Sequence, residues 1–216
     1  VGIGIAVLAG LVAELAGSAD PLPPVAFLGI ALFALADRQR DRVKWTYRSG
    51  GATLALSGAL LLTTLDGRYG WFDPGPSAVL VTTVLASVVG AGWLLSQGDR
   101  HAAGWTGTAV VAIGAATGLA ALAPDTLPDV AAFLGSHVTM LVVVAATGYF
   151  GYRSGSRRFV DLAALAALGQ TLSFVASTVV DSLSGSVALV VAGLILLGVG
   201  MTLERGRRTV LARLHR

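Results

Sequence analysis

The tetrapeptide Tyr152-Arg153-Ser154-Gly155 occurs twice in this chain, since the same four residues stand at Tyr47-Arg48-Ser49-Gly50. Tyr152 follows Tyr47 by 105 positions in a chain of 216 residues, which is close to half its length. At the same offset, residues 20–26 (DPLPPVA) align with residues 125–131 (DTLPDVA), and five of the seven positions are identical. The repeat predicts two copies of one unit, residues 1–105 and 106–216.

The composition indicates an integral membrane protein. Hydrophobic residues make up 55% of the chain and charged residues 12%, against roughly 25% charged in soluble domains. The mean hydropathy is +0.77. A soluble protein of this size could not cover that much apolar surface. The chain has no Cys, which excludes disulfides and thiolate chemistry.

Eight apolar segments follow one another along the chain, and we expect each to be a transmembrane helix. Most approach the ~20 residues that cross a bilayer, and they lack the alternation of barrel strands. Residues 1–17 lack the basic region and cleavage site of a typical signal peptide, so we expect them to form the first crossing. The segments are residues 1–17, 24–36, 50–65, 77–96, 103–122, 130–152, 159–180 and 186–203.

The charges of the connections alternate in sign and set the topology. Fourteen of the fifteen Lys and Arg residues fall in segments 37–49, 97–102, 153–158 and 204–216, and Arg68 alone falls on the other side. The positive-inside rule makes the basic side cytoplasmic. We therefore expect a multi-pass protein of the cytoplasmic membrane with both termini in the cytoplasm. Its anchors on that side would be Arg48, Arg153, Arg157 and Arg158, which can also bind anionic lipid headgroups.

The repeated tetrapeptide is interpreted as a turn between the second and third helices of each unit. Tyr can lie at the headgroups, Arg can hold the loop on the cytoplasmic side, and Ser-Gly can reverse the chain. An even number of crossings per unit gives both copies the same orientation, so the two four-helix repeats would be parallel.

Small residues predict where helices pack closely in the membrane. Gly107, Gly114 and Gly118 share one face of the fifth expected helix, at spacings of seven and four. Ser87 belongs to a similar stripe on the fourth. We interpret both stripes as helix-packing seams and not as binding sites.

A few polar residues lie deep in the expected helices and break the repeat. His137 and Gln170 fall near the middle of the sixth and seventh helices, and the repeat aligns His137 with Leu32. Gln170, Ser173 and Ser177 share one helix face, which would form a polar lane facing His137. Glu14 could close that lane near the outer end of the first helix. These residues are candidates for a ligand or transport site, while the alternative is a structural hydrogen bond between the helices.

Several chemistries receive no support from the sequence. The chain has a single Lys, Lys44, and no cluster with metal-ligand spacing, so we expect no cofactor, no metal and no catalytic residue. The basic loops follow topology, so we expect no nucleic-acid binding.

Three functions remain open for the chain. The first is a non-enzymatic scaffold or accessory subunit of a membrane complex, as a homo- or hetero-oligomer in the lipid bilayer. The second is a small-solute transporter or channel with a site between the repeats near His137 and Gln170. A membrane-embedded enzyme acting on lipid is the third.

Overall fold

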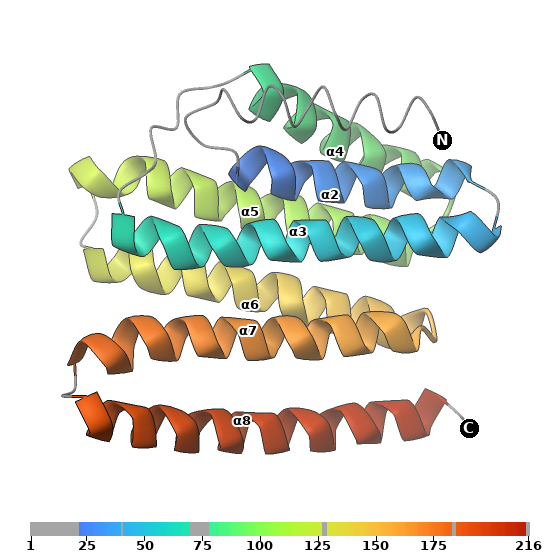
Figure 1. The fold of residues 1–216 in the computed structure, drawn as a ribbon. Helices are drawn as coiled ribbons and strands as arrows, with labels where there is room; N and C mark the ends of the chain where they lie inside the picture. The colour runs from blue at the N-terminus through green and yellow to red at the C-terminus, as the bar shows by residue number, and fades with distance from the viewer. Residues whose placement is uncertain (1–21, 40, 70–77, 127–128, 183–184, 215–216) are drawn as a thin grey trace.

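The structure is a computed structural model that describes residues 22–39, 41–69, 78–126, 129–182 and 185–214. In these ranges the chain forms seven α-helices and one short 3-10 helix, without a strand, so the prediction of an all-helical fold is confirmed. Figure 1 shows the helices lying side by side as a bundle. They are α2 (Leu22–Leu35), η1 (Ala36–Arg38), α3 (Asp41–Tyr69), α4 (Ala78–Ser96), α5 (Arg100–Thr126), α6 (Asp129–Arg153), α7 (Arg157–Ser182) and α8 (Gly185–Leu214).

By length and composition, two helical segments of the described chain could cross a membrane. They are Leu134–Arg153 in α6 and Arg157–Thr178 in α7. Leu80–Ser96 in α4 is apolar but shorter, and α2 has only 14 residues. Of the eight crossings expected from the sequence, these two have the length and apolar composition of a membrane span. The first expected crossing, residues 1–17, lies outside the described residues.

The two copies of the tetrapeptide have different structures. The second copy ends α6 as expected: Gly155 has a φ of +67°, and the Ser156 N–H donates to the Gly151 carbonyl at 2.9 Å. This bond and the left-handed glycine form a Schellman cap. The first copy lies inside α3, which begins at Asp41. The predicted turn is therefore wrong there, because the chain already reverses at η1, where Gln39 is extended with a ψ of 160°.

The closest contact between helix backbones joins α2 and α3. A Cβ on Gly29 would lie 2.4 Å from the Ala55 nitrogen, and a Cβ on Gly51 would lie 2.6 Å from the Gly29 carbonyl oxygen. A Cβ on Gly58 would meet Ala26 at 2.9 Å. Only glycine permits this approach, which brings the two backbones together without intervening side chains. The seam of α2 and α3 is thus the most rigidly specified contact of the bundle.

Helix α4 packs on α2 and α5. Ser87 is fully buried in this contact, and its Oγ lies 2.8 Å from the Phe27 carbonyl of α2 and 2.8 Å from the Thr83 carbonyl of its own helix. A Cβ on Gly90 would meet Ala34 of α2 at 2.6 Å. Ser87 and Gly90 therefore mark the face by which α4 joins the bundle.

The glycines of α5 have a different environment. In the described part of the chain, a Cβ on Gly107 or Gly118 would have no atom within 4 Å, and one on Gly114 would meet only the ring of Phe27 at 3.9 Å. The stripe expected to be a packing seam thus lies against open space within the described residues.

Helix α8 lies at one edge of the bundle and packs on α7 (Figure 1). An ion pair also links them, since the Arg207 Nε donates to Asp161 Oδ1 of α7 at 2.6 Å. Toward its middle, α8 exposes large apolar side chains, among them Leu194 and Leu197.

The seam of α2 and α3 predicts a contrast between two glycine substitutions. Gly29→Ala should lower the free energy of unfolding by about 1–3 kcal/mol or more, because the added methyl overlaps the α3 backbone. Gly107→Ala is the matched control: it adds the same methyl in open space and should gain up to ~1 kcal/mol of helix propensity. Circular dichroism of thermal unfolding in detergent measures both. Equal midpoints for the two variants would contradict the packing described above.

Candidate functional site

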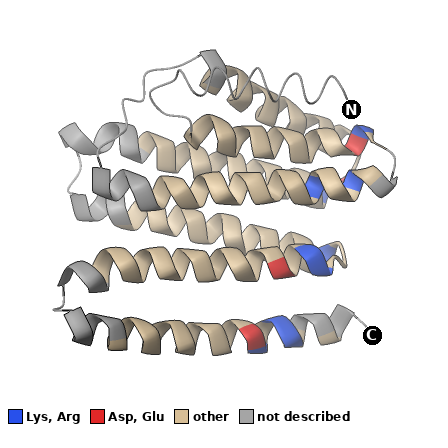
Figure 2. Cartoon of the chain, viewed as in Figure 1, with Lys and Arg blue, Asp and Glu red and all other residues tan. Residues whose placement is uncertain are grey.

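The charged residues that Figure 2 colours gather at one end of the bundle. This end contains η1, the start of α3, the turn between α4 and α5, and the turn between α6 and α7. We call it the charged end. Among the described residues, Arg48 is the one buried cation of the charged end, with 3% of its surface exposed.

Two carboxylates neutralise Arg48. Its Nη2 donates to Asp99 Oδ2 at 2.6 Å and lies 3.4 Å from Asp37 Oδ1. Asp37 also binds the Lys44 ammonium. Two cations and two anions therefore compensate one another, and they join η1, α3 and the turn between α4 and α5 in one network.

Aromatic rings surround the guanidinium on the remaining sides. Its carbon lies 5.4 Å from the ring centre of Phe33, 5.8 Å from Trp45 and 5.8 Å from Phe150. Phe33 also packs on Trp105 of α5, with ring centres 4.0 Å apart, and on Phe159 of α7 at 6.0 Å. These five rings come from α2, α3, α5, α6 and α7, so the cation sits where five helices converge. We call this group the Arg48 cluster.

Asp99 serves two elements at once. Its Oδ1 accepts the Ala102 N–H at 3.0 Å, which caps the start of α5, while its other oxygen binds Arg48. Burial raises the pKa of Asp99, but the hydrogen bonds from Arg48 and Ala102 and the charges of Arg48 and Lys44 outweigh it, so the pKa lies below its usual value.

The four expected cytoplasmic anchors differ in exposure. Arg153, Arg157 and Arg158 are exposed at the turn between α6 and α7. Arg48 does not lie on an exposed loop, since it is buried inside α3. This role was not predicted from the sequence, although Phe33 before the basic segment and Trp45 inside it were a signal that a cation could be covered there.

The second group of interest lies between α6 and α7. His137, Gln170 and Ser173 are buried, with exposed fractions of 4%, 3% and 7%. His137 lies against the ring of Phe174, one residue beyond Ser173, with ring centres 5.3 Å apart and planes inclined by 68°. Its Nδ1 is 3.4 Å from the Oγ of Ser136, its neighbour in the chain.

Gln170 reaches α3 instead of the His137 side. Its Oε1 lies 3.2 Å from the Thr63 hydroxyl, and its neighbour Gly169 lies so close to Leu60 that a Cβ would meet that side chain at 3.0 Å. His137 and Gln170 therefore lie on α6 and α7 as expected. His137 contacts Phe174, whereas Gln170 contacts Thr63. Ser177 donates to the Ser173 carbonyl at 2.9 Å, and Glu14 lies outside the described residues.

Two polar atoms of this group lack a hydrogen-bond partner in the described part of the chain, the Nε2 of Gln170 and the Oγ of Ser173. Leaving a buried donor unsatisfied costs about 1–3 kcal/mol. Most buried polar groups are bonded, so two such atoms on neighbouring turns of α7 mark a site where the closed packing is unfavourable.

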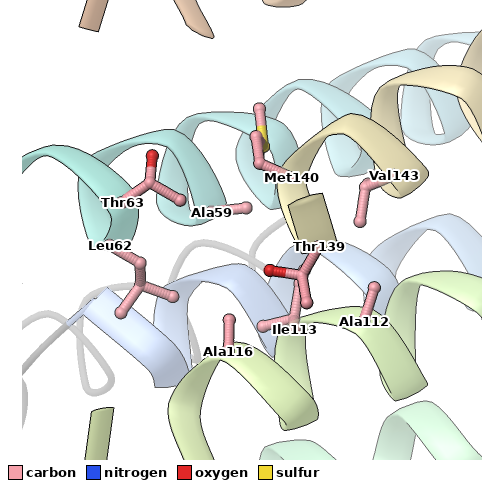
Figure 3. Close-up of a pocket in the computed structure, with 9 residues that line it drawn as sticks. All are labelled: Ala59, Leu62, Thr63, Ala112, Ile113, Ala116, Thr139, Met140 and Val143. Atoms are coloured by element: carbon pink, nitrogen blue, oxygen red, sulfur yellow. The ribbon is translucent and has the colours of Figure 1, made fainter. Parts of the chain in front are cut away.

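A small cavity lies beside this group, between α3, α5 and α6 (Figure 3). Its volume is about 10 Å³, which is close to the minimum for one water molecule. Thr63 and Thr139 are its polar lining residues, and both hydroxyls donate to backbone carbonyls of their own helix, at 2.8 and 2.7 Å. Neither His137 nor Gln170 lines it. The other lining residues are Ala59, Leu62, Ala112, Ile113, Ala116, Met140 and Val143.

Metal binding has no geometric basis in the described ranges, where no three His, Asp or Glu side chains come together to hold an ion. Comparison with known proteins adds no assignment: no protein-family model, no curated protein and no solved structure matches this chain. The charges of the charged end compensate one another and hold helices together, although the Arg48 Nε has no hydrogen-bond partner in the described residues. Gln170 and Ser173 of α7 also have unused hydrogen-bonding capacity, and no ion pair accompanies it.

The lowered pKa of Asp99 predicts a loss of stability in acid. Because the pKa is lower in the folded than in the unfolded chain, the ion pair stabilises the fold above the unfolded value. This contribution disappears as the pH falls through the folded value, so the unfolding midpoint should drop below about pH 4. Asp99→Asn, which can still cap α5, should lower the midpoint at neutral pH and flatten the acid dependence.

The control is Gln97→Ala, which changes an exposed residue of the same turn and should keep the full acid dependence. An unchanged pH profile in Asp99→Asn would show that the pair with Arg48 contributes nothing to stability.

Proposed function

We propose that the chain is a multi-pass integral membrane protein that serves as a non-enzymatic scaffold or accessory subunit of a membrane complex. In this proposal all eight apolar segments cross the bilayer, in two parallel four-helix units, residues 1–105 and 106–216. The charged end faces the cytoplasm, where its exposed arginines contact anionic headgroups.

The observation that carries the proposal is the distribution of exposed apolar side chains. Helices on different sides of the bundle carry large apolar residues that are at least half exposed, while the charged residues coloured in Figure 2 lie toward one end. Monomeric soluble proteins rarely expose so much apolar surface to water, whereas lipid or neighbouring membrane chains would cover it. Examples are Leu85 and Val89 on α4, Val111 on α5, Leu141 on α6, Leu165 and Leu172 on α7, and Leu194 and Leu197 on α8.

The role of a component, and not of an enzyme or transporter, is supported by the closed core. The cavity between α3, α5 and α6 holds about 10 Å³, far below the ~300 Å³ or more of typical small-molecule sites. A larger hollow of about 450 Å³ is lined by residues of α8 alone, among them Leu197 and Met201, and so lies outside the core. The buried ionic network at the charged end is internally compensated, which suits a rigid scaffold.

Small-solute passage is the second candidate function. The unsatisfied atoms of Gln170 and Ser173 favour it, because a polar solute crossing between α6 and α7 would meet them.

The scaffold proposal predicts that the chain leaves native membranes within a larger assembly. Alkaline carbonate should not release it, and extraction in mild detergent should give one discrete complex with a protein mass above the 21.9 kDa of a single copy. Sedimentation equilibrium with detergent matching measures this mass. In proteoliposomes, Gln170→Leu should leave the permeability to small neutral solutes unchanged.

Release by carbonate would overturn the membrane assignment. A single copy of 21.9 kDa that raises solute permeability, with the increase lost in Gln170→Leu, would replace the scaffold by the second candidate.

A further inference from the structure

The side chain of Gln170 carries an unmet hydrogen bond whichever way its amide is oriented. The Thr63 hydroxyl has one proton but two acceptors near it, the Leu60 carbonyl at 2.8 Å and Gln170 Oε1 at 3.2 Å. Because the carbonyl is the closer of the two, the amide nitrogen suits the Thr63 contact better, and exchanging the amide O and N gives that arrangement. In one orientation the amide nitrogen of Gln170 has no partner in the described chain, and in the other orientation the amide oxygen has none.

Ser173 differs from the other hydroxyl residues around it. Thr171 donates to the Ala167 carbonyl at 2.9 Å, and Ser177 donates to the Ser173 carbonyl at 2.9 Å. Such bonds to the preceding turn are the usual solution for hydroxyls on helices. The Ser173 hydroxyl is buried and makes no hydrogen bond of this kind within the described chain. It can therefore still donate and accept a hydrogen bond inside the bundle.

The two groups lie one turn apart on the inward face of α7, next to a ring that reaches the surface. Phe174 is 38% exposed, and its ring also lies against buried His137. One side of this ring therefore covers the interior while another faces the surroundings.

We propose that the buried face of α7 at Gln170 and Ser173 is a hydration site, which water enters beside Phe174. Water is the ligand that fits, because it both donates and accepts, and so satisfies a serine hydroxyl and either end of the Gln170 amide. The inference rests on side-chain packing and is independent of the proposed scaffold function.

The native absence of Cys allows a direct test by cysteine accessibility. Ser173→Cys is nearly isosteric, and its thiol reacts with aminoethyl methanethiosulfonate only as the thiolate, which requires water. We expect its labelling rate in the purified full chain to exceed that of Val143→Cys by on the order of tenfold or more. Val143 is the matched buried control, with 1% exposed in the apolar core.

Two further variants sharpen the result. Gln97→Cys on the exposed turn gives the upper limit of the labelling rate. Phe174→Leu in the Ser173→Cys background should accelerate labelling, because the smaller side chain covers less of the site. Labelling of Ser173→Cys no faster than Val143→Cys, while Gln97→Cys reacts, would overturn the hydration site. Release of the chain by carbonate would instead affect only the membrane proposal, since the rates are compared within one preparation.

The sign of the Ser173→Ala effect on stability is a second readout that needs no labelling. Removing a hydroxyl that is bonded to water should lower the unfolding midpoint, because that hydrogen bond is lost. Removing a dry, unsatisfied hydroxyl should raise it. A raised midpoint would therefore contradict the proposal.

Discussion

A single buried guanidinium sets the arrangement of the charged end. Arg48 is 3% exposed, and a cation in that position is tolerated only if carboxylates and hydrogen bonds compensate the loss of hydration. Asp37 and Asp99 provide this compensation from two different turns, and the aromatic rings of the Arg48 cluster exclude water around it. The ion pairs therefore restrict the relative positions of the helices that carry these groups, although the Arg48 Nε has no hydrogen-bond partner among the described residues. The adjoining seam of α2 and α3, where Gly29 meets Gly51, allows the backbones to come close enough for those positions.

The same constraint distinguishes α2 and α3 from α6 and α7, the pair with which the sequence repeat aligns them. At the offset of 105 positions, Gly29 aligns with Leu134 and Gly58 with Ala163, so the backbones of α6 and α7 cannot approach there as α2 and α3 do. Arg48 aligns with Arg153, which is exposed. The second pair of helices thus lacks the buried cation, and in the described residues its closest glycine contact lies beside the turn, where a Cβ on Gly151 would meet the Val160 nitrogen at 2.8 Å. It has side-chain space instead, and that space holds the buried His137, Gln170 and Ser173.

Fold class and helix positions could be predicted from the sequence because apolar segments and turn residues act locally. The Schellman cap at Gly155 is such a local feature, and the second tetrapeptide was interpreted correctly. The first copy was not, since the choice between turn and helix at Tyr47–Gly50 depends on the reversal at η1 and on the acids that receive Arg48. Both are tertiary effects that the tetrapeptide itself does not encode.

The packing residues were also only partly accessible from sequence. The spacing of Gly107, Gly114 and Gly118 predicted a seam, but spacing does not say which face meets a neighbour. Gly51, Ala55 and Ala59 repeat at every fourth position of α3 and gave an equally good signal. For the candidate site, the depth of His137 and Gln170 along their helices was predictable. The contacts with Phe174 and Thr63 were not, because they depend on the rotation of α6 and α7 about their axes.

The two copies of one tetrapeptide provide the most direct test that the Arg48 cluster positions the helices. Arg48→Ala leaves Asp37 and Asp99 without their shared partner and should lower the free energy of unfolding by about 3–5 kcal/mol. Arg153→Ala makes the identical change at the exposed copy and should alter it by no more than about 0.5 kcal/mol. Denaturant unfolding of the two variants in the same detergent measures the difference. Losses of similar size at both positions would contradict the account.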